Sequence, residues 1–567
     1  MLSASLRQMA ESHLEAIQER LHDFDDVVCV LILIEAVRVI DYENVLMGSS
    51  ADESHHLPYP EFDIMCRGWN PLMSCLLPRL PKLVGIPIQE STPESRSRAR
   101  SLLHAFGKCA VLQKAADMAR HGLIVGTEIE NILSLRMTFA QDSDHFLDQL
   151  EEEKLEAVLN GDDAEKQTPG RLSREEVDEL VASLVFPFET GHGTIVGYDA
   201  DPRLDAHFIE QVGERTMKWR TEAGIHPGVQ ASGLDGADVA AVALMLISFY
   251  LKHIWFVGVG SKRLEGINYC MSLTIWKKPE DLVDSIAGFT GISVERVKAA
   301  LKAVLVTKDD AGYFSHEGTP FMPLLLEISD GYWLAPVSSI FRNPLQEIRM
   351  LNEHRFPSIG PSIRAPREEW MISDLCGLFQ GNRYQVVDTP TRLKRNNVTI
   401  TDIDAAILDK TTGELALFQL KWQDFGSNLL RKIRSRAKNF VDQVSTWASH
   451  TDGWIEEFGE AELCRSLRLK LPKGASLTGI RLFAIGKSNA RFASYGYDLV
   501  NPKLAACNWD QFVRLRYEIG PADIVFSEIH VRILSEKSRG LDRKPLPCSI
   551  EVGDMTVRFE DMWSTSE

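Results

Sequence analysis

The sequence lacks several features that would place it in a common class of protein. Its nine cysteines include no CxxC pair, so the spacing of a zinc site is missing. Their odd number and scattered positions indicate reduced thiols and a cytoplasmic location. An excess of basic residues is also missing, because the formal net charge is −18 and the pI is about 5.4. This balance argues against a protein coated in basic surface, so any nucleic-acid site must be a local patch.

Long apolar runs are missing too. The run "VVCVLILI" stops at Glu35, and "VAAVALMLISFYL" stops at Lys252. Both fall short of the roughly 20 residues that a membrane-spanning helix needs. The first residues also lack the basic-then-apolar order of a signal peptide. We therefore expect these runs to be buried in a folded core, with no membrane partner. P-loop, GxSxG and kinase motifs are likewise missing.

The length and composition predict several globular domains. The chain has 567 residues, of which 44% are hydrophobic and 25% are charged. An acidic stretch, "EEEKLEAVLNGDDAEKQTPG", is typical of a linker or an exposed helix and suggests a boundary near residue 165. The prolines of "RFPSIGPSIRAP" suggest a second boundary near residue 355. We predict a helical domain over 1–165, a mixed domain over 166–355 and an α/β domain over 356–567.

The last third of the chain has the pattern of an α/β domain with a mixed central sheet. The predicted order is a helix, three strands, a helix and a strand, at 367–379, 384–388, 398–409, 414–422, 428–450 and 479–486. The fold class is therefore a multidomain α+β protein, in which a mainly helical N-terminal region precedes an α/β domain.

Polar residues interrupt two of these apolar strands. Alternation places Gln419 and Lys421 on the same face of their strand. If residues 410–413 form a four-residue hairpin loop, Asp404 lies opposite Gln419 and Asp402 lies opposite Lys421. Because directly opposed residues point to the same side, all four polar groups would converge.

This set of side chains suits metal-assisted chemistry on phosphate esters. Carboxylate and amide oxygens are ligands for Mg²⁺ or Mn²⁺. A neighbouring lysine can orient a water molecule or stabilise developing phosphate charge. The set is therefore typical of metal-dependent phosphodiester hydrolysis. The simpler structural alternative is that Asp404 and Gln419 satisfy each other while Lys421 extends to solvent.

Asp404, followed after fourteen residues by Gln419-Leu420-Lys421, resembles the PD-(D/E)xK nuclease motif. The resemblance implies a restriction-endonuclease-like fold, with metal ligands on Asp404, Gln419 and the carbonyl of Leu420, and Lys421 as the catalytic lysine. Most members of the family have Glu or Asp at the position of Gln419. The Mrr-like enzymes of the family have a glutamine there. The resemblance also implies an endonuclease of prokaryotic restriction or anti-phage defence, acting on DNA rather than RNA.

Three further residues are candidates for the same site. The family often supplies a glutamate from its first helix, and Glu368 lies near the middle of the apolar face of helix 367–379, so we expect it in the site. Glu369, about 100° away on the helix, is a secondary candidate. Both could instead be first-turn acids that favour the helix dipole. Gln443 on the following helix is a further secondary candidate, as is Asp402.

A basic segment follows the motif. It belongs to an otherwise acidic chain, and its position next to the candidate metal site favours contact with nucleic-acid phosphates. The alternative is an ordinary solvated helix face. The candidate residues, three of them in the loop before the second strand, are Arg392, Lys394, Arg395, Arg431, Lys432, Arg434, Arg436 and Lys438.

Two other functions remain open at this stage. Because Gln419 removes a negative charge, the domain could be an inactive nuclease-fold scaffold or a nucleic-acid-binding sensor protein. The region 1–355 could be a sensor that gates the nuclease, although its sequence shows no nameable chemistry. The oligomeric state is open, and it includes a homo-oligomer.

Overall fold

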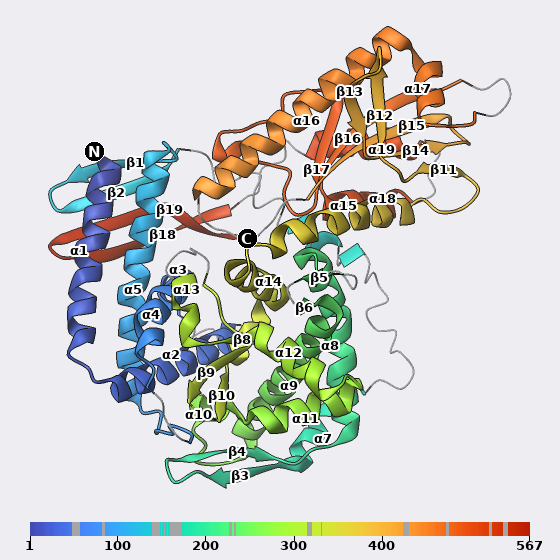
Figure 1. The fold of residues 1–567 in the computed structure, drawn as a ribbon. Helices are drawn as coiled ribbons and strands as arrows, with labels where there is room; N and C mark the ends of the chain where they lie inside the picture. Colours follow the sequence, from blue (N-terminus) through green and yellow to red (C-terminus); the bar gives the residue numbers. More distant parts are fainter. Residues whose placement is uncertain are drawn as a thin grey trace.

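The computed structural model describes residues 1–47, 57–81, 85–138, 148, 150–151, 153–155, 157–158, 172–225, 229–231, 234–314, 320–329, 331–422, 430–471, 476–520, 524–536 and 543–566. Over these residues the protein is a mixed α+β fold with several separate sheets (Figure 1).

The N-terminal region is mainly helical, as predicted. Its apolar helix α2, which contains "VVCVLILI", is buried along most of its length. The elements are α1 (Leu2–His22), α2 (Asp26–Met47), α3 (Tyr59–Arg67), α4 (Trp69–Leu76), a 3-10 turn (Leu77–Arg79), α5 (Pro93–Arg120), β1 (Ile124–Ile129) and β2 (Ile132–Met137).

The middle region surrounds a long apolar helix, α9. This helix is long and apolar enough to cross a membrane, but 56% of its most apolar window is buried inside the protein, as in a core helix. The elements are α7 (Arg174–Leu184), β3 (Val185–Glu189), β4 (Thr194–Tyr198), α8 (Pro202–Ala223), β5 (Gln230–Ala231), β6 (Leu234–Asp235), α9 (Gly236–Arg263), α10 (Tyr269–Leu273), β7 (Ile275–Lys277), α11 (Pro279–Thr290), α12 (Val294–Val304), β8 (Leu305–Val306), α13 (Ala311–Phe314), β9 (Leu325–Ser329), β10 (Tyr332–Ala335) and α14 (Pro344–Arg355), with 3-10 turns at Lys308–Asp310 and Val337–Phe341.

The predicted boundary near residue 165 does not separate two cores. Leu33 and Trp69 belong to the same buried cluster as Val306 and Leu334. The indole N–H of Trp69 also donates to the carbonyl of Phe321 at 2.6 Å. Residues on both sides of the acidic stretch therefore pack as one unit, a long-range arrangement that local sequence patterns do not indicate.

The C-terminal α/β unit, defined here as residues 359–536, lies above the rest of the molecule in Figure 1. Its elements are α15 (Ile359–Gly377), β11 (Tyr384–Val387), β12 (Thr391–Arg395), β13 (Val398–Ile403), β14 (Ala405–Asp409), β15 (Glu414–Lys421), α16 (Leu430–Phe458), α17 (Glu460–Ser466), β16 (Gly479–Gly486), a 3-10 turn (Ala493–Tyr495), β17 (Leu504–Asn508), α18 (Trp509–Ile519) and α19 (Val525–Glu536).

The central sheet of this unit is mixed, as predicted. Its strand order is β11-β14-β15-β16-β17. β14 is antiparallel to both β11 and β15, whereas β16 is parallel to both β15 and β17. Every residue of β15 except Lys421 is buried, which is expected of a central strand covered by helices on both faces. α16 packs with the face that holds Leu415 and Leu417.

The segment "RFPSIGPSIRAP" does not break the structure as predicted, because most of it lies in α15. Pro361 is in the first turn of this helix, where the backbone N–H would have no intrahelical partner anyway. Pro366 lies inside the helix and removes one hydrogen bond from it. The predicted boundary near 355 therefore falls between α14 and α15.

The end of the chain leaves the C-terminal α/β unit. The predicted hairpin forms as β18 (Arg543–Val552) and β19 (Met555–Ser566), with Gly553 at a positive φ of 59° in the turn. β19 pairs with β2 in parallel, which completes a four-stranded sheet in the order β1-β2-β19-β18. Residues 543–566 therefore belong with the N-terminal helices rather than with the predicted third domain.

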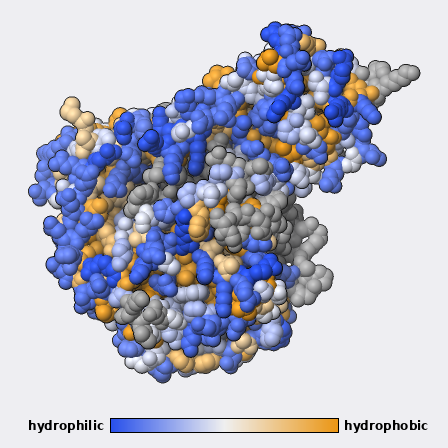
Figure 2. Space-filling model, in the orientation of Figure 1, coloured by the Kyte–Doolittle hydropathy of each residue, from blue (hydrophilic) through white to orange (hydrophobic). Residues whose placement is uncertain are grey.

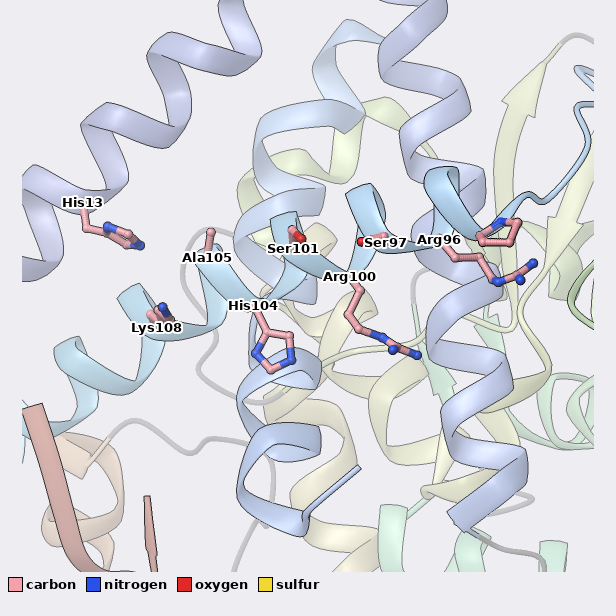
Figure 3. Close-up of a pocket in the computed structure, with 9 residues that line it drawn as sticks. His13, Arg96, Ser97, Arg100, Ser101, His104, Ala105 and Lys108 are labelled. Carbon is pink, nitrogen blue, oxygen red and sulfur yellow. The ribbon is translucent and has the colours of Figure 1, made fainter. Parts of the chain in front are cut away.

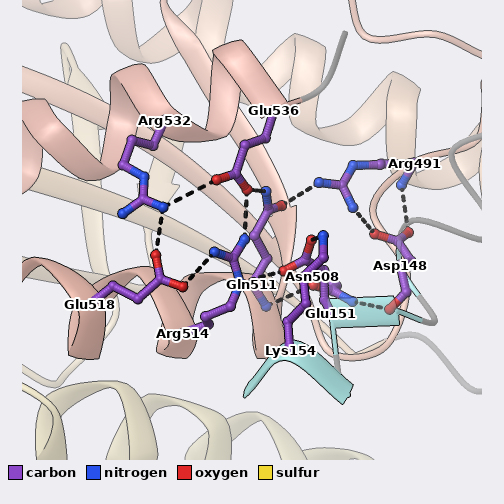
Figure 4. A network of polar contacts seen from close by, with 10 residues as sticks. All are labelled: Asp148, Glu151, Lys154, Arg491, Asn508, Gln511, Arg514, Glu518, Arg532 and Glu536. Carbon is purple, nitrogen blue, oxygen red and sulfur yellow. Dashed lines mark hydrogen bonds and ion pairs between the residues drawn. The ribbon is translucent and has the colours of Figure 1, made fainter. Parts of the chain in front are cut away.

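A buried polar network joins the acidic stretch to the C-terminal α/β unit (Figure 4). Asp148 contacts Arg491 at 2.8 Å, and Glu151 contacts Arg514 at 2.7 Å. Glu151 is only 1% exposed, so this part of the stretch is not the exposed helix or linker that its charge predicts. The ion pairs account for the burial, because each carboxylate meets a guanidinium.

Candidate active site

The β14–β15 hairpin has the predicted register. Ala405 lies opposite Phe418, and Leu408 lies opposite Leu415. Gly413 closes the loop at a positive φ of 77°, which a residue with a side chain rarely adopts. Continued by one residue, this register brings Asp404 next to Gln419, as the alternation of side chains predicts.

The strand predicted over 398–409 is interrupted at Asp404. The backbone N–H of Asp404 still donates to Phe418 at 3.1 Å. Beyond it, β13 turns away and pairs with β12, so Asp402 lies opposite Arg392 and not opposite Lys421 as predicted. The indole N–H of Trp447 on α16 donates to the carbonyl of Asp402 at 2.7 Å, which holds β13 against that helix.

Asp404 is the hydrogen-bonding centre of the site. Its Oδ2 accepts the backbone N–H of Leu420 at 2.7 Å and a short hydrogen bond from Nε2 of Gln419. The carboxylate thus replaces the backbone partner that Leu420 loses where β13 leaves the sheet. Neither bond uses Oδ1 of Asp404 or Oε1 of Gln419, and both oxygens are free of other hydrogen bonds to described residues.

The charges around Asp404 come from the other predicted residues. Burial raises the pKa of the Asp404 carboxyl to about 6, while the Leu420 amide and Lys421 act in the lowering direction. Asp402 and Glu368 act on it in the raising direction. Direct contacts therefore join Asp404 to Gln419 and to the Leu420 amide, and Lys421 is the next residue of β15. Asp402 and Glu368 act on Asp404 only through their charge.

Replacing Asp404 with asparagine is expected to stabilise the free protein near neutral pH. The folded pKa of about 6 exceeds the ordinary value of 3.8, so folding takes up a proton between these values. The resulting stability is fully present below the unfolded pKa and is lost as pH rises through the folded pKa. The gain in melting temperature of D404N over the native protein should therefore be larger at about pH 7.5 than at about pH 5. An equal gain at both values would contradict the burial of a charged carboxylate.

Glu368 and Glu369 are both exposed, so Glu368 is not buried with the apolar face of α15. Glu368 is nevertheless the one of the two that acts on Asp404. Gln443 is exposed on α16, and among the described residues its side chain has no hydrogen bond.

Lys487 and Trp422 also belong to the neighbourhood, although sequence reasoning missed both. The backbone N–H of Lys487 donates to the carbonyl of Lys421 at 2.9 Å. The Lys487 ammonium lies 5.8 Å from the ring centre of Trp422 and 5.0 Å from that of Trp509. The sequence did contain one indication of Lys487, which is its position directly after the predicted strand 479–486. Polar groups of a site gather beyond the carboxyl ends of neighbouring parallel strands.

The basic residues of α16 lie on the same side of the sheet as Gln419 and Lys421. Mainly hydrophilic residues cover this helix in Figure 2. Arg431, Lys432 and Lys438 are exposed, and Lys438 forms an ion pair with Asp442 one turn along the helix. Arg434 is committed to the fold, since its guanidinium donates to the carbonyl of Tyr495 at 2.5 Å. Arg436 is partly exposed.

The other basic candidates lie on a strand, not in the predicted loop. Arg392, Lys394 and Arg395 are exposed on β12. Arg395 pairs with Glu457 on α16 at 2.6 Å, and the indole N–H of Trp454 donates to the carbonyl of Lys394 at 3.1 Å. The β12–β13 ribbon is therefore fixed to the C-terminal part of α16, whereas the basic residues 431–438 lie in the first turns of that helix.

No family model, curated protein or solved structure matches this chain. The arrangement of its own residues is therefore the basis for a function.

Proposed function

We propose that the C-terminal α/β unit is a metal-dependent endonuclease of the PD-(D/E)xK kind. The observation that carries the proposal is the meeting of Asp404 with Gln419 across the β14–β15 hairpin, in the predicted register and beside Lys421. The order helix, strand, hairpin, helix and parallel strand in α15, β11, β14–β15, α16 and β16 supports it.

The donor set fits a Mg²⁺ or Mn²⁺ ion. Hard cations of this kind take carboxylate, amide and carbonyl oxygens. Asp404, Gln419 and the Leu420 carbonyl would hold the metal, and Glu368 remains the proposed source of a second carboxylate. No group of three or more His, Cys, Asp or Glu side chains suited to a metal occurs in the described part of the chain, so the neutral oxygens are required. A bound metal ion supplies an activated water and charge neutralisation at the phosphate.

The protein's own groups would then position the reaction. The Lys421 ammonium makes no ion pair with a described residue, so it can hold the attacking water or the developing charge on phosphate. The Leu420 N–H fixes Asp404, and the main chain of Lys487 fixes the end of β15. The exposed cations of α16 and β12 would bind neighbouring backbone phosphates without reading sequence.

DNA is the proposed substrate, in preference to RNA, on the resemblance stated above. The proposed setting is prokaryotic restriction or anti-phage defence in the cytoplasm. All nine cysteines are free thiols, which supports a reducing compartment.

The test is incubation of the protein with plasmid, linear duplex, single-stranded DNA and RNA, with Mg²⁺, Mn²⁺ or EDTA. We expect cleavage of at least one DNA substrate that requires the metal and that Asp404→Ala abolishes. At a fixed, subsaturating Mg²⁺ concentration, metal binding and activity should fall as pH is lowered, because protons compete with the metal for Asp404. Metal-independent cleavage, or cleavage by D404A at the native rate, would overturn the proposal.

A second candidate function is an inactive nuclease-fold scaffold that binds nucleic acid. The hydrogen bond from Gln419 to Asp404 favours it, because the two groups already satisfy each other without a metal. Calorimetric titration with Mn²⁺ separates the two functions. Binding that D404A loses supports the nuclease, whereas no binding at millimolar Mn²⁺ supports the scaffold.

A further inference from the structure

A groove rich in basic residues lies on α5, in the N-terminal helical region and in a different part of the molecule from β14 and β15 (Figures 1 and 3). It has a cavity volume of about 630 Å³. One residue of its lining comes from α1 and the rest from α5: His13, Pro93, Arg96, Ser97, Arg100, Ser101, His104, Ala105 and Lys108.

The helix repeat of α5 shapes this groove. Arg96, Arg100, His104 and Lys108 follow one another every fourth residue, so their side chains form a row along one face (Figure 3). A parallel row of small residues, represented by Ser101, lies beside it. The small residues leave the space of the groove open, and the long basic side chains supply charge at the edge of the groove.

The positive charge of the groove is largely uncompensated. None of its lining residues is acidic, although the whole chain has a net charge of −18. Arg96 donates to the carbonyl of Ser91 at 2.9 Å, and Lys108 donates to the carbonyl of Glu551 at 3.2 Å. These acceptors are neutral, and only Arg100 has a carboxylate partner, Glu43, among the described residues.

Two nitrogen atoms of the lining also lack partners. Nε2 of His13 and Nε of Arg100 are buried, and neither hydrogen bonds to any described group. Burial, followed by the charge of Lys108, lowers the pKa of both His13 and His104. A bound anion would offset these costs, because it supplies acceptors and negative charge to the same groups.

A second cavity, of about 520 Å³, continues from the first and shares Pro93, Arg96 and Arg100 with it. It is lined by Tyr42 and Tyr269, whose rings meet edge to face at 5.8 Å. Glu90 is also in its lining, and it is exposed with no ion pair to a described residue. Aromatic rings can contact a nucleobase, and a carboxylate can accept both hydroxyls of a ribose.

We propose that this pair of cavities binds a free nucleoside polyphosphate. The base and ribose occupy the cavity of Tyr42, Tyr269 and Glu90, and the phosphates extend along the cationic row of α5. Each cavity volume, about 630 Å³ and about 520 Å³, is in the range of small-molecule sites. The proposal is independent of the nuclease assignment and gives the N-terminal region a ligand.

The test is calorimetric titration of the full chain with ATP, GTP and inorganic triphosphate, in EDTA so that the candidate metal site does not contribute. We expect a nucleotide to bind at one site per chain and more tightly than triphosphate alone. Ser101→Glu places a negative charge on an exposed position of the groove and should weaken binding at least about tenfold. Arg98→Ala is the matched control, because Arg98 is exposed on the same helix but lines neither cavity.

Three results would overturn the proposal. One is no nucleotide binding at millimolar concentration, and another is equal binding of S101E and the native protein. The third is binding of triphosphate as tight as that of every nucleotide, which would make the groove a general anion surface. A native melting curve for S101E ensures that its loss of binding is not unfolding.

Discussion

Lys421→Ala is expected to abolish metal-dependent cleavage while leaving the fold unchanged. Removal of a single group that stabilises transition-state charge costs about 10²–10³-fold in rate. Lys421 ends β15 as its least buried residue, and its side chain makes no hydrogen bond or ion pair within the described chain. Its loss therefore removes no hydrogen bond or ion pair to a described residue, and the main effect should appear in catalysis.

Single-turnover cleavage rates with saturating Mg²⁺ are the appropriate measurement, because they separate chemistry from substrate binding. Lys410→Ala is the matched control. Lys410 is an exposed lysine in the loop of the same hairpin, at the other end of the strands from Lys421. A K421A enzyme that cleaves at the rate of K410A would rule out the proposed role of Lys421.

The candidate site could be predicted from the sequence where its geometry is local. The pairing of Asp404 with Gln419 follows from the alternation of β15 and from the loop that Gly413 closes. Those two constraints fix every pair along the hairpin. The mixed sheet also follows from the order of its elements, because β15 and β16 are separated by a long helix and so can be parallel.

The position of Asp402 could not be predicted in this way. An unbroken strand over 398–409 satisfies every local preference of the sequence. The strand ends instead because the Asp404 side chain takes the Leu420 N–H and because Trp447 holds the carbonyl of Asp402. Both are contacts of a single side chain with a backbone group, which compete with the regular sheet only in the folded protein.

Contacts between elements that are far apart in the chain could not be predicted from the sequence either. β18 and β19 form the predicted hairpin, but nothing in their pattern identifies β2 as the neighbouring strand. The same is true of the acidic stretch, where Glu151 is buried against Arg514. Charge alone predicts exposure, and only the partner on a distant element reverses that expectation.

Asp148→Ala is expected to lower the free energy of unfolding by about 3–5 kcal/mol, the range for breaking a buried ion pair. Asp148 is fully buried, and its side chain accepts Nη1 of Arg491 at 2.8 Å and the backbone N–H groups of Ala490 and Arg491 at 2.9 and 3.0 Å. Alanine would leave the Arg491 guanidinium buried without its carboxylate. Chemical denaturation should show the loss, and amide hydrogen exchange should accelerate at positions 490 and 491.

A double variant separates two causes of that loss, which are the missing ion pair and the buried, unpaired charge that Arg491 is left with. Burial raises the pKa of Asp148 to about 6 although Arg491 acts in the lowering direction. Removing the charged carboxylate from water therefore costs free energy that the ion pair only partly offsets. Replacing Arg491 with methionine in the D148A background removes the unpaired charge and should recover part of the stability. Asp442→Ala is the surface control, because the Lys438–Asp442 pair is more than half exposed and should change stability by less than about 1 kcal/mol. If D148A unfolds like D442A, the network does not hold the acidic stretch against the C-terminal α/β unit.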